Sequence, residues 1–200
     1  MKRRRRSTKE SNAPKTIYFD DRGDKRLLVG NTILVVSSKT MSLISDPFKA
    51  MLDPDGAFSE AQPGNNEPIL LPEDDLNALK LLLWIAHLHF NKVPARLEFE
   101  ELVAVAVLTD KYQATRMISP WLSGWVANLK DTVYKDGYEE WLWIAWEFGL
   151  ADIFKKVANK LFWQSRTNAN GDCVTARGKI LAENMPPEII GNGVSYLSFS

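Results

Sequence analysis

Residues 25–39 read KRLLVGNTILVVSSK, and this stretch decides the N-terminal part of the fold. Two five-residue runs, Lys25–Val29 and Thr32–Val36, are rich in leucine, valine and isoleucine, which suit a half-buried β-strand. Gly30 and Asn31 alone separate the two runs, and a two-residue link of this kind is typical of a tight β-hairpin. The stretch therefore predicts two antiparallel strands.

Two short helices are expected after the hairpin. Ser37-Ser38 favours a helix N-terminus because a serine hydroxyl can accept a hydrogen bond from a free backbone N–H, and Met41 and Ile44 follow at helical spacing. A second helix is expected at Asp46, which would cap it, with Pro47 in its first turn.

Two further short strands are predicted on either side of these elements. Thr16–Asp20 is β-prone and precedes the hairpin, whereas Ile69–Leu71 is a brief apolar run that follows a long polar segment. That segment, residues 53–68, is rich in proline, glycine and polar side chains and is predicted to be a loop. The sheet should therefore be small.

The rest of the chain is predominantly helical by its periodicity. Acidic residues lead several segments, where they would interact favourably with the helix macrodipole. The predicted helices are Leu76–Ala86, Glu98–Lys111, Ser119–Leu129 and Tyr138–Phe162, the last interrupted at Gly149. Residues 165–184 lose this periodicity. Strands and helices together predict an α+β fold.

The charge of the chain is unevenly distributed. Basic and acidic residues number 25 each, but six basic residues lie within the first nine, which contain no acid. Residues 1–15 are therefore predicted to be a disordered basic tail with a run typical of nuclear import, formed by Lys2, Arg3, Arg4, Arg5 and Arg6. The remaining body is acidic, which argues against a specific nucleic-acid interface.

Few residues of the chain suit catalysis or cofactor binding. Cys173 is the single cysteine, and His87 and His89 would point to opposite sides of a helix, so no metal site is expected. Nucleotide-binding and nucleophile motifs are missing from the sequence, and we expect neither a cofactor nor an enzyme. The longest apolar run, Leu102–Leu108, is too short to span a membrane, so a protein of the nucleus or cytoplasm is expected.

A series of short sequence motifs occurs along these predicted elements. They are Gly23-Asp24, Val36-Ser37-Ser38-Lys39, Ser45–Leu52, Leu70–Asp75, Leu81–His87, Asp110-Lys111-Tyr112-Gln113 and Pro120-Trp121. Taken together, they resemble the BTB/POZ domain, most closely the stand-alone BTB proteins of filamentous fungi. The resemblance implies a BTB/POZ domain over 16–130, a helical post-BTB extension over 131–164 and a loosely ordered segment over 165–200.

The resemblance also implies a function in protein–protein association, with a small mixed sheet flanked by a helical cluster. Members of the family commonly form homodimers through the first short helix and the N-terminal strand. The corresponding dimer-interface residues here are Ile17, Phe19, Lys39, Met41 and Ile44. A charged pocket at the dimer seam would be formed by Asp24 and Lys39.

Two alternative functions remain open at this stage. Some BTB proteins are adaptors of cullin-based ubiquitin ligases, and the resemblance would place their cullin-facing surface near Leu88 and Phe90. The glutamate of the family's cullin motif is missing there, and the first glutamate that follows is Glu98. The other alternative is a nuclear, transcription-associated factor that uses the arginine tail for import.

Seven tryptophans are unusual for a chain of this length, and most are expected to form core. Trp121 and Trp125 are four residues apart and share one helix face. Trp141, Trp143 and Trp146 cannot all face the same way within two helical turns. One of these three is therefore a candidate contact for a partner protein.

Overall fold

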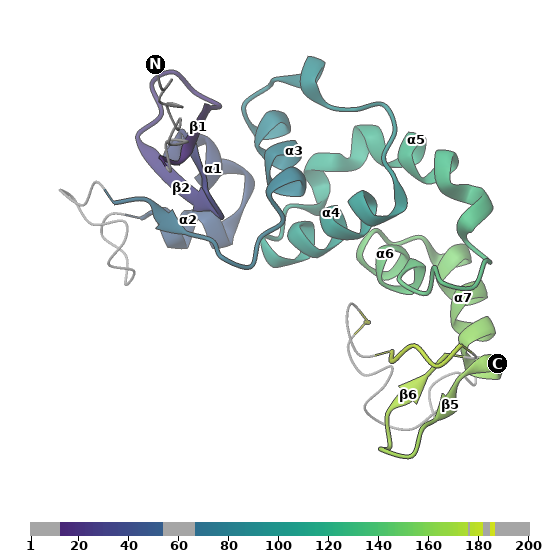
Figure 1. The fold of residues 1–200 in the computed structure, drawn as a ribbon. Coiled ribbons are helices and arrows are strands. Elements are labelled where there is room, and N and C mark those ends of the chain that lie inside the picture. The colour runs from purple at the N-terminus through teal and green to yellow at the C-terminus, as the bar shows by residue number, and fades with distance from the viewer. Residues whose placement is uncertain (1–12, 54–66, 176, 182–184, 187–200) are drawn as a thin grey trace, which may run out of the picture.

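The computed structural model describes residues 13–53, 67–175, 177–181 and 185–186. The basic run Lys2–Arg6, most of the loop predicted over 53–68 and the end of the C-terminal segment lie outside these described residues. Figure 1 shows the sheet and the first two helices at one end of the molecule, α3 and α4 in the middle, and α6 and α7 towards the other end. The fold is mixed α+β, as the sequence predicts.

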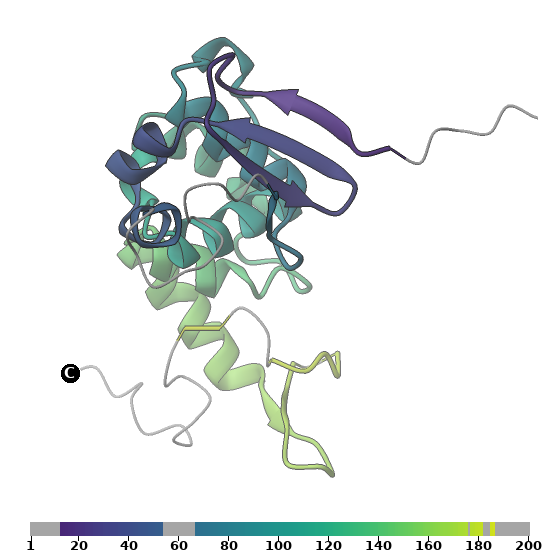
Figure 2. The same cartoon turned by 90° about the vertical axis from the view of Figure 1, so that its left-hand side faces the viewer.

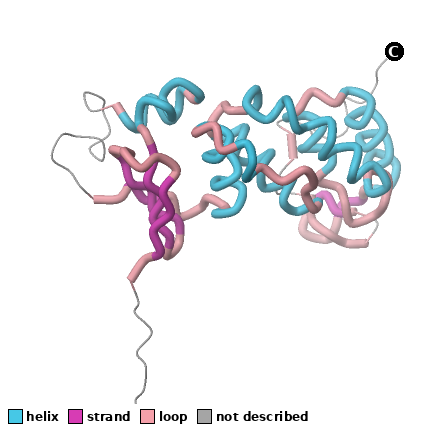
Figure 3. The backbone as a smooth tube through the Cα atoms, turned by 90° about the horizontal axis from the view of Figure 1, so that it is seen from above, coloured by secondary structure: helices cyan, strands magenta, loops and turns pink. Residues whose placement is uncertain are grey.

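A four-stranded sheet forms the N-terminal end. It comprises β1 (Lys15–Tyr18), β2 (Lys25–Val29), β3 (Thr32–Val36) and β4 (Ile69–Leu70), in the order β1-β3-β2-β4. The predicted hairpin is confirmed, because β2 and β3 pair antiparallel with Val29 opposite Thr32. β1 and β4 pair in parallel with β3 and β2, so they form the two edges of the sheet, which Figure 3 shows in magenta.

Gly23 allows the chain to pass close to β3 before β2 begins. A Cβ atom at this position would lie 2.8 Å from Val35 Cγ1 and 2.8 Å from the backbone oxygen of Val36. Real Cβ atoms do not approach other heavy atoms so closely, so the turn can pack against β3 only with glycine at this position.

The two short helices follow β3 as predicted. In α1 (Ser38–Ile44), the hydroxyl of Ser37 accepts a hydrogen bond from the Thr40 N–H. In α2 (Asp46–Leu52), the prediction that Asp46 is the cap is wrong. Ser45 is the N-cap, because it has an extended backbone and its hydroxyl accepts from the Phe48 N–H at 3.0 Å.

Among the described residues, five further helices follow β4. They are α3 (Leu76–Ala86), α4 (Phe99–Lys111), α5 (Ser119–Leu129), α6 (Trp141–Glu147) and α7 (Ala151–Gln164). Single 3₁₀ turns at Phe90–Lys92, Thr115–Ile118 and Lys130–Thr132 connect several of them. Asp75 caps α3, and Glu98 and Glu101 form a capping box at α4.

The predicted interruption at Gly149 is confirmed and separates α6 from α7. Gly149 has φ +66°, a left-handed conformation that ends a helix and that glycine adopts without steric cost. Beyond α7, a small hairpin of β5 (Arg166–Thr167) and β6 (Cys173–Val174) was not expected, because strands of two residues are too short to show alternation.

One hydrophobic core joins the sheet to the helices. Leu27 and Leu34 from the sheet and Leu83 and Leu102 from the helices are fully buried within it. Figure 2 shows the sheet lying across the helices that complete this core. No described helix is long and apolar enough to cross a membrane.

Candidate interaction surface

The apolar residues of α1 lie on two faces of the helix. One face packs in the core of the chain and the other is exposed to solvent. Met41 is 1% exposed and packs in the core of its own chain, and Ile44 is half-buried against the same core. Leu43 points the other way and is 80% exposed. Met41 is the residue of α1 that the sequence predicts for the interface, but the apolar side chain that α1 presents to solvent is Leu43.

The N-terminus of α1 is fixed by hydrogen bonds from two other elements. Asp24 accepts from the backbone N–H of Ser38 at 2.7 Å and from its hydroxyl at 2.6 Å. His87, at the end of α3, accepts from the Ser37 N–H through Nε2 at 3.2 Å. Its Nδ1 lies 2.9 Å from the Leu83 carbonyl, which assigns the ring proton to Nδ1.

These contacts determine the charge states at this end of the helix. Partial burial disfavours the Asp24 carboxylate, but the hydrogen bonds from Ser38 outweigh it and lower the pKa of Asp24. Burial lowers the pKa of His87, which favours the neutral ring. Lys39 is exposed, and no ion pair joins it to Asp24 in the part of the chain that the structure describes.

The strand β1 and the residue that follows it also carry both exposed and buried apolar side chains. Tyr18 is exposed at the open edge of the sheet, and Ile17 is half-buried against the core. Phe19 is buried, with its ring centre 6.4 Å from that of Trp84 and 6.0 Å from that of His87. Phe19, which was predicted for the interface, therefore packs inside its own chain, whereas its neighbour Tyr18 is exposed to solvent.

A cavity of about 460 Å³ lies between β1, α1 and the end of α3. Tyr18, Thr40 and Leu88 contribute to its walls, and Leu88 is 73% exposed. Thr40 and Leu43 are three residues apart on α1 and so share one helix face. We use the name α1–β1 face for this cavity, with Tyr18, Thr40 and Leu88 in its walls, together with Leu43, which lies next to Thr40 on α1.

The aromatic residues predicted to contact a partner are divided between core and surface. Trp141 is fully buried and donates its indole N–H to the Thr132 hydroxyl, so it is a core residue and not a contact. Trp143 is half-buried with its ring against Trp146, and Trp146 is 41% exposed. Phe90 is exposed as predicted for a surface residue, and its ring leans on Trp121.

No group of three or more histidine, cysteine, aspartate or glutamate side chains suited to a metal ion occurs among the described residues. Comparisons with known proteins add no assignment, since no protein-family model matches the sequence and no curated protein is recognisably similar to it.

Proposed function

We propose that this chain is a non-catalytic protein–protein interaction module of the BTB/POZ type, which self-associates through the α1–β1 face. The order of elements supports the proposal: a hairpin, two short helices, a brief further strand and then a helical cluster. This order of elements, together with the short sequence motifs described above, resembles that of the BTB/POZ domain.

The exposure of Leu43 on α1 is the observation that carries the proposal. A leucine transferred from water to an apolar interface stabilises the complex by about 2 kcal/mol. Tyr18 and Leu88 add exposed apolar area on the same face, and β1 has an edge on which another strand can pair. These features together favour a protein partner, and a second copy of the chain supplies a complementary edge.

The state of His87 favours binding over catalysis on this face. A general base needs a free ring nitrogen within reach of its substrate. Both nitrogens of His87 already have partners, the Leu83 carbonyl and the Ser37 N–H. The histidine therefore holds α1 in place.

Substituting Leu43→Asp tests the proposal. The wild-type chain should be a dimer by light scattering, and Leu43→Asp should be a monomer with an unchanged melting temperature, because a buried carboxylate opposes association while the side chain is free in the monomer. Leu70→Asp is the matched control, because Leu70 is 66% exposed on β4, at the opposite edge of the sheet. This variant should stay dimeric. A monomeric wild type, or a dimeric Leu43→Asp, would contradict the proposal.

A further inference from the structure

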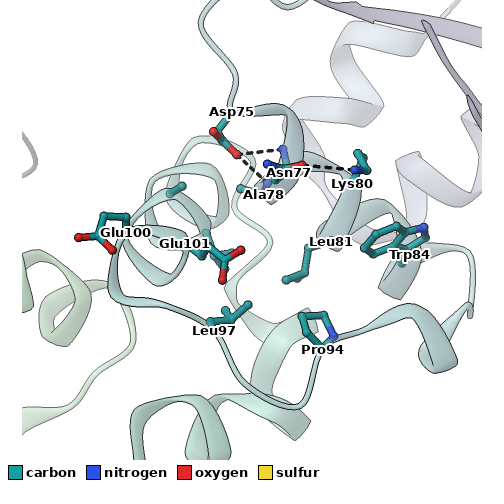
Figure 4. Close-up of a pocket in the computed structure, with 12 residues that line it drawn as sticks. Asp75, Asn77, Ala78, Lys80, Leu81, Trp84, Pro94, Leu97, Glu100 and Glu101 are labelled. Carbon is teal, nitrogen blue, oxygen red and sulfur yellow. Dashed lines mark hydrogen bonds between the residues drawn. The ribbon is translucent and has the colours of Figure 1, made fainter. Parts of the chain in front are cut away.

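A second cavity, of about 380 Å³, lies between α3 and the first turns of α4. We call it the α3–α4 pocket (Figure 4). Leu81, Leu97 and Val105 provide apolar lining, and Trp84 forms one wall. An aromatic wall above an apolar floor suits a long side chain that has an aliphatic stem and a planar or charged end.

The rim of this pocket is predominantly acidic. Asp75, Glu100 and Glu101 line it, against one lysine, Lys80, which lies 5.5 Å from the Trp84 ring centre. Figure 4 shows the Glu101 carboxylate directed towards Leu81, across the pocket from Trp84. The excess of negative charge selects a cationic occupant.

Two of these carboxylates keep one oxygen atom outside their capping bonds. Asp75 accepts the Asn77 and Ala78 N–H groups through Oδ1, and Glu101 accepts the Glu98 N–H through Oε2. Asp75 Oδ2 and Glu101 Oε1 are not used by the caps. Both carboxylates are therefore held in position by local structure while retaining an acceptor for a guanidinium.

We propose that the arginine run Arg3–Arg6 of the same chain docks in the α3–α4 pocket. The run is the densest basic stretch of the sequence, and a guanidinium pairs with carboxylates and stacks on an indole in one geometry. The proposal does not depend on self-association, because the pocket and the tail belong to one chain.

The length of the tail allows this contact. Lys15 begins β1 and Leu70 ends β4, both at the end of the sheet where the β2–β3 turn lies. These two edges are three strand spacings apart, about 14 Å, and Asp75 follows Leu70 by five residues. Asp75 therefore lies within about 31 Å of Lys15, and the chain from Arg3 to Lys15 spans up to about 40 Å when extended, which is enough to reach the rim.

Docking would control whether the tail is available to other binding partners. While the arginines occupy the pocket, they are not free for an import receptor or another polyanionic surface. Because the contact is electrostatic and partly exposed, it should weaken as the ionic strength rises.

Paramagnetic relaxation in the full chain tests the proposal. A nitroxide attached at Ser7→Cys, in a Cys173→Ser background, should broaden the indole N–H signal of Trp84. It should leave the signal of Trp163, on α7, unchanged. The double variant Asp75→Asn, Glu101→Gln keeps both helix caps but removes two charges, and should reduce the broadening at Trp84 about fivefold.

A matched control separates the pocket from general charge effects. Asp131→Asn with Asp152→Asn also removes two exposed acids near helix starts, and should leave the broadening of Trp84 unchanged. A mixture of spin-labelled and unlabelled chains, with only the unlabelled chain enriched in ¹⁵N, should show no broadening. Three results would overturn docking within one chain. They are no broadening of Trp84 in the spin-labelled chain, equal broadening in the variant Asp75→Asn, Glu101→Gln, and broadening in the mixture.

Discussion

At the scale of single residues, His87 connects protonation to the position of α1. Its neutral ring accepts from the Ser37 N–H, and a protonated ring would present a second donor to that group. Burial lowers the pKa of His87 from 6.5 and outweighs the hydrogen bond to the Leu83 carbonyl and the charge of Asp20, which both raise it. The unfolded chain therefore takes up this proton at a higher pH than the folded chain does.

This linkage predicts a loss of stability on mild acidification. Between the unfolded pKa of 6.5 and the lower folded pKa, the unfolded state binds more protons, so stability present above pH 6.5 declines as the pH falls. Denaturant unfolding measured between pH 7.5 and 5 should show this decline in the wild type and in His89→Gln, and a flatter profile in His87→Gln. Equal slopes in the two variants would assign the effect to another group.

At the scale of elements, two glycines in the helical part should respond to the same substitution with opposite signs. Gly149 has φ +66° between α6 and α7, whereas Gly124 lies within α5, and an added Cβ would meet nothing within 4 Å at either position. Gly149→Ala should therefore lower the unfolding free energy by about 1 kcal/mol through backbone strain alone. Gly124→Ala should raise it by about 0.5–1 kcal/mol, and thermal melts of the two variants would reveal the signs.

At the scale of the whole molecule, α6 shares the core of the preceding helices. Phe99 of α4 lies with its ring centre 5.9 Å from that of Trp141 and 4.8 Å from that of Tyr138. We predict that Trp141→Ala lowers the stability of the whole chain by about 3–5 kcal/mol in one transition, seen equally at β3 and α6 amides by hydrogen exchange. Trp146→Ala should cost far less because Trp146 is partly exposed, and separate transitions would indicate independent units.

The sequence predicted those parts of the molecule that depend on local chemistry. The β2–β3 hairpin and the break at Gly149 follow from short-range steric rules, and both agree with the structure. The choice between Met41 and Leu43 depends on which face of a seven-residue helix meets the sheet, and two apolar residues on opposite faces leave that choice open. The same applies to Trp141, whose burial is decided by Phe99, a residue far away in the sequence.

The α3–α4 pocket could not be predicted from the sequence for a related reason. Each acid at its rim was explained by its own helix, Asp75 by α3 and Glu101 by α4. What places both carboxylates on one cavity is the packing of these two helices, which no local pattern encodes. Local capping chemistry and the proposed recognition of a cation thus use the same two side chains.

The close approach of Gly23 to β3 has a consequence for how the gene can vary. A Cβ at this position would meet the backbone oxygen of Val36, which cannot move without distorting the strand, and the side chain of Val35 as well. Codon changes that replace Gly23 should therefore be removed by selection in every lineage that keeps this fold. Codons for exposed residues outside the α1–β1 face, such as Arg26 on β2, should drift freely.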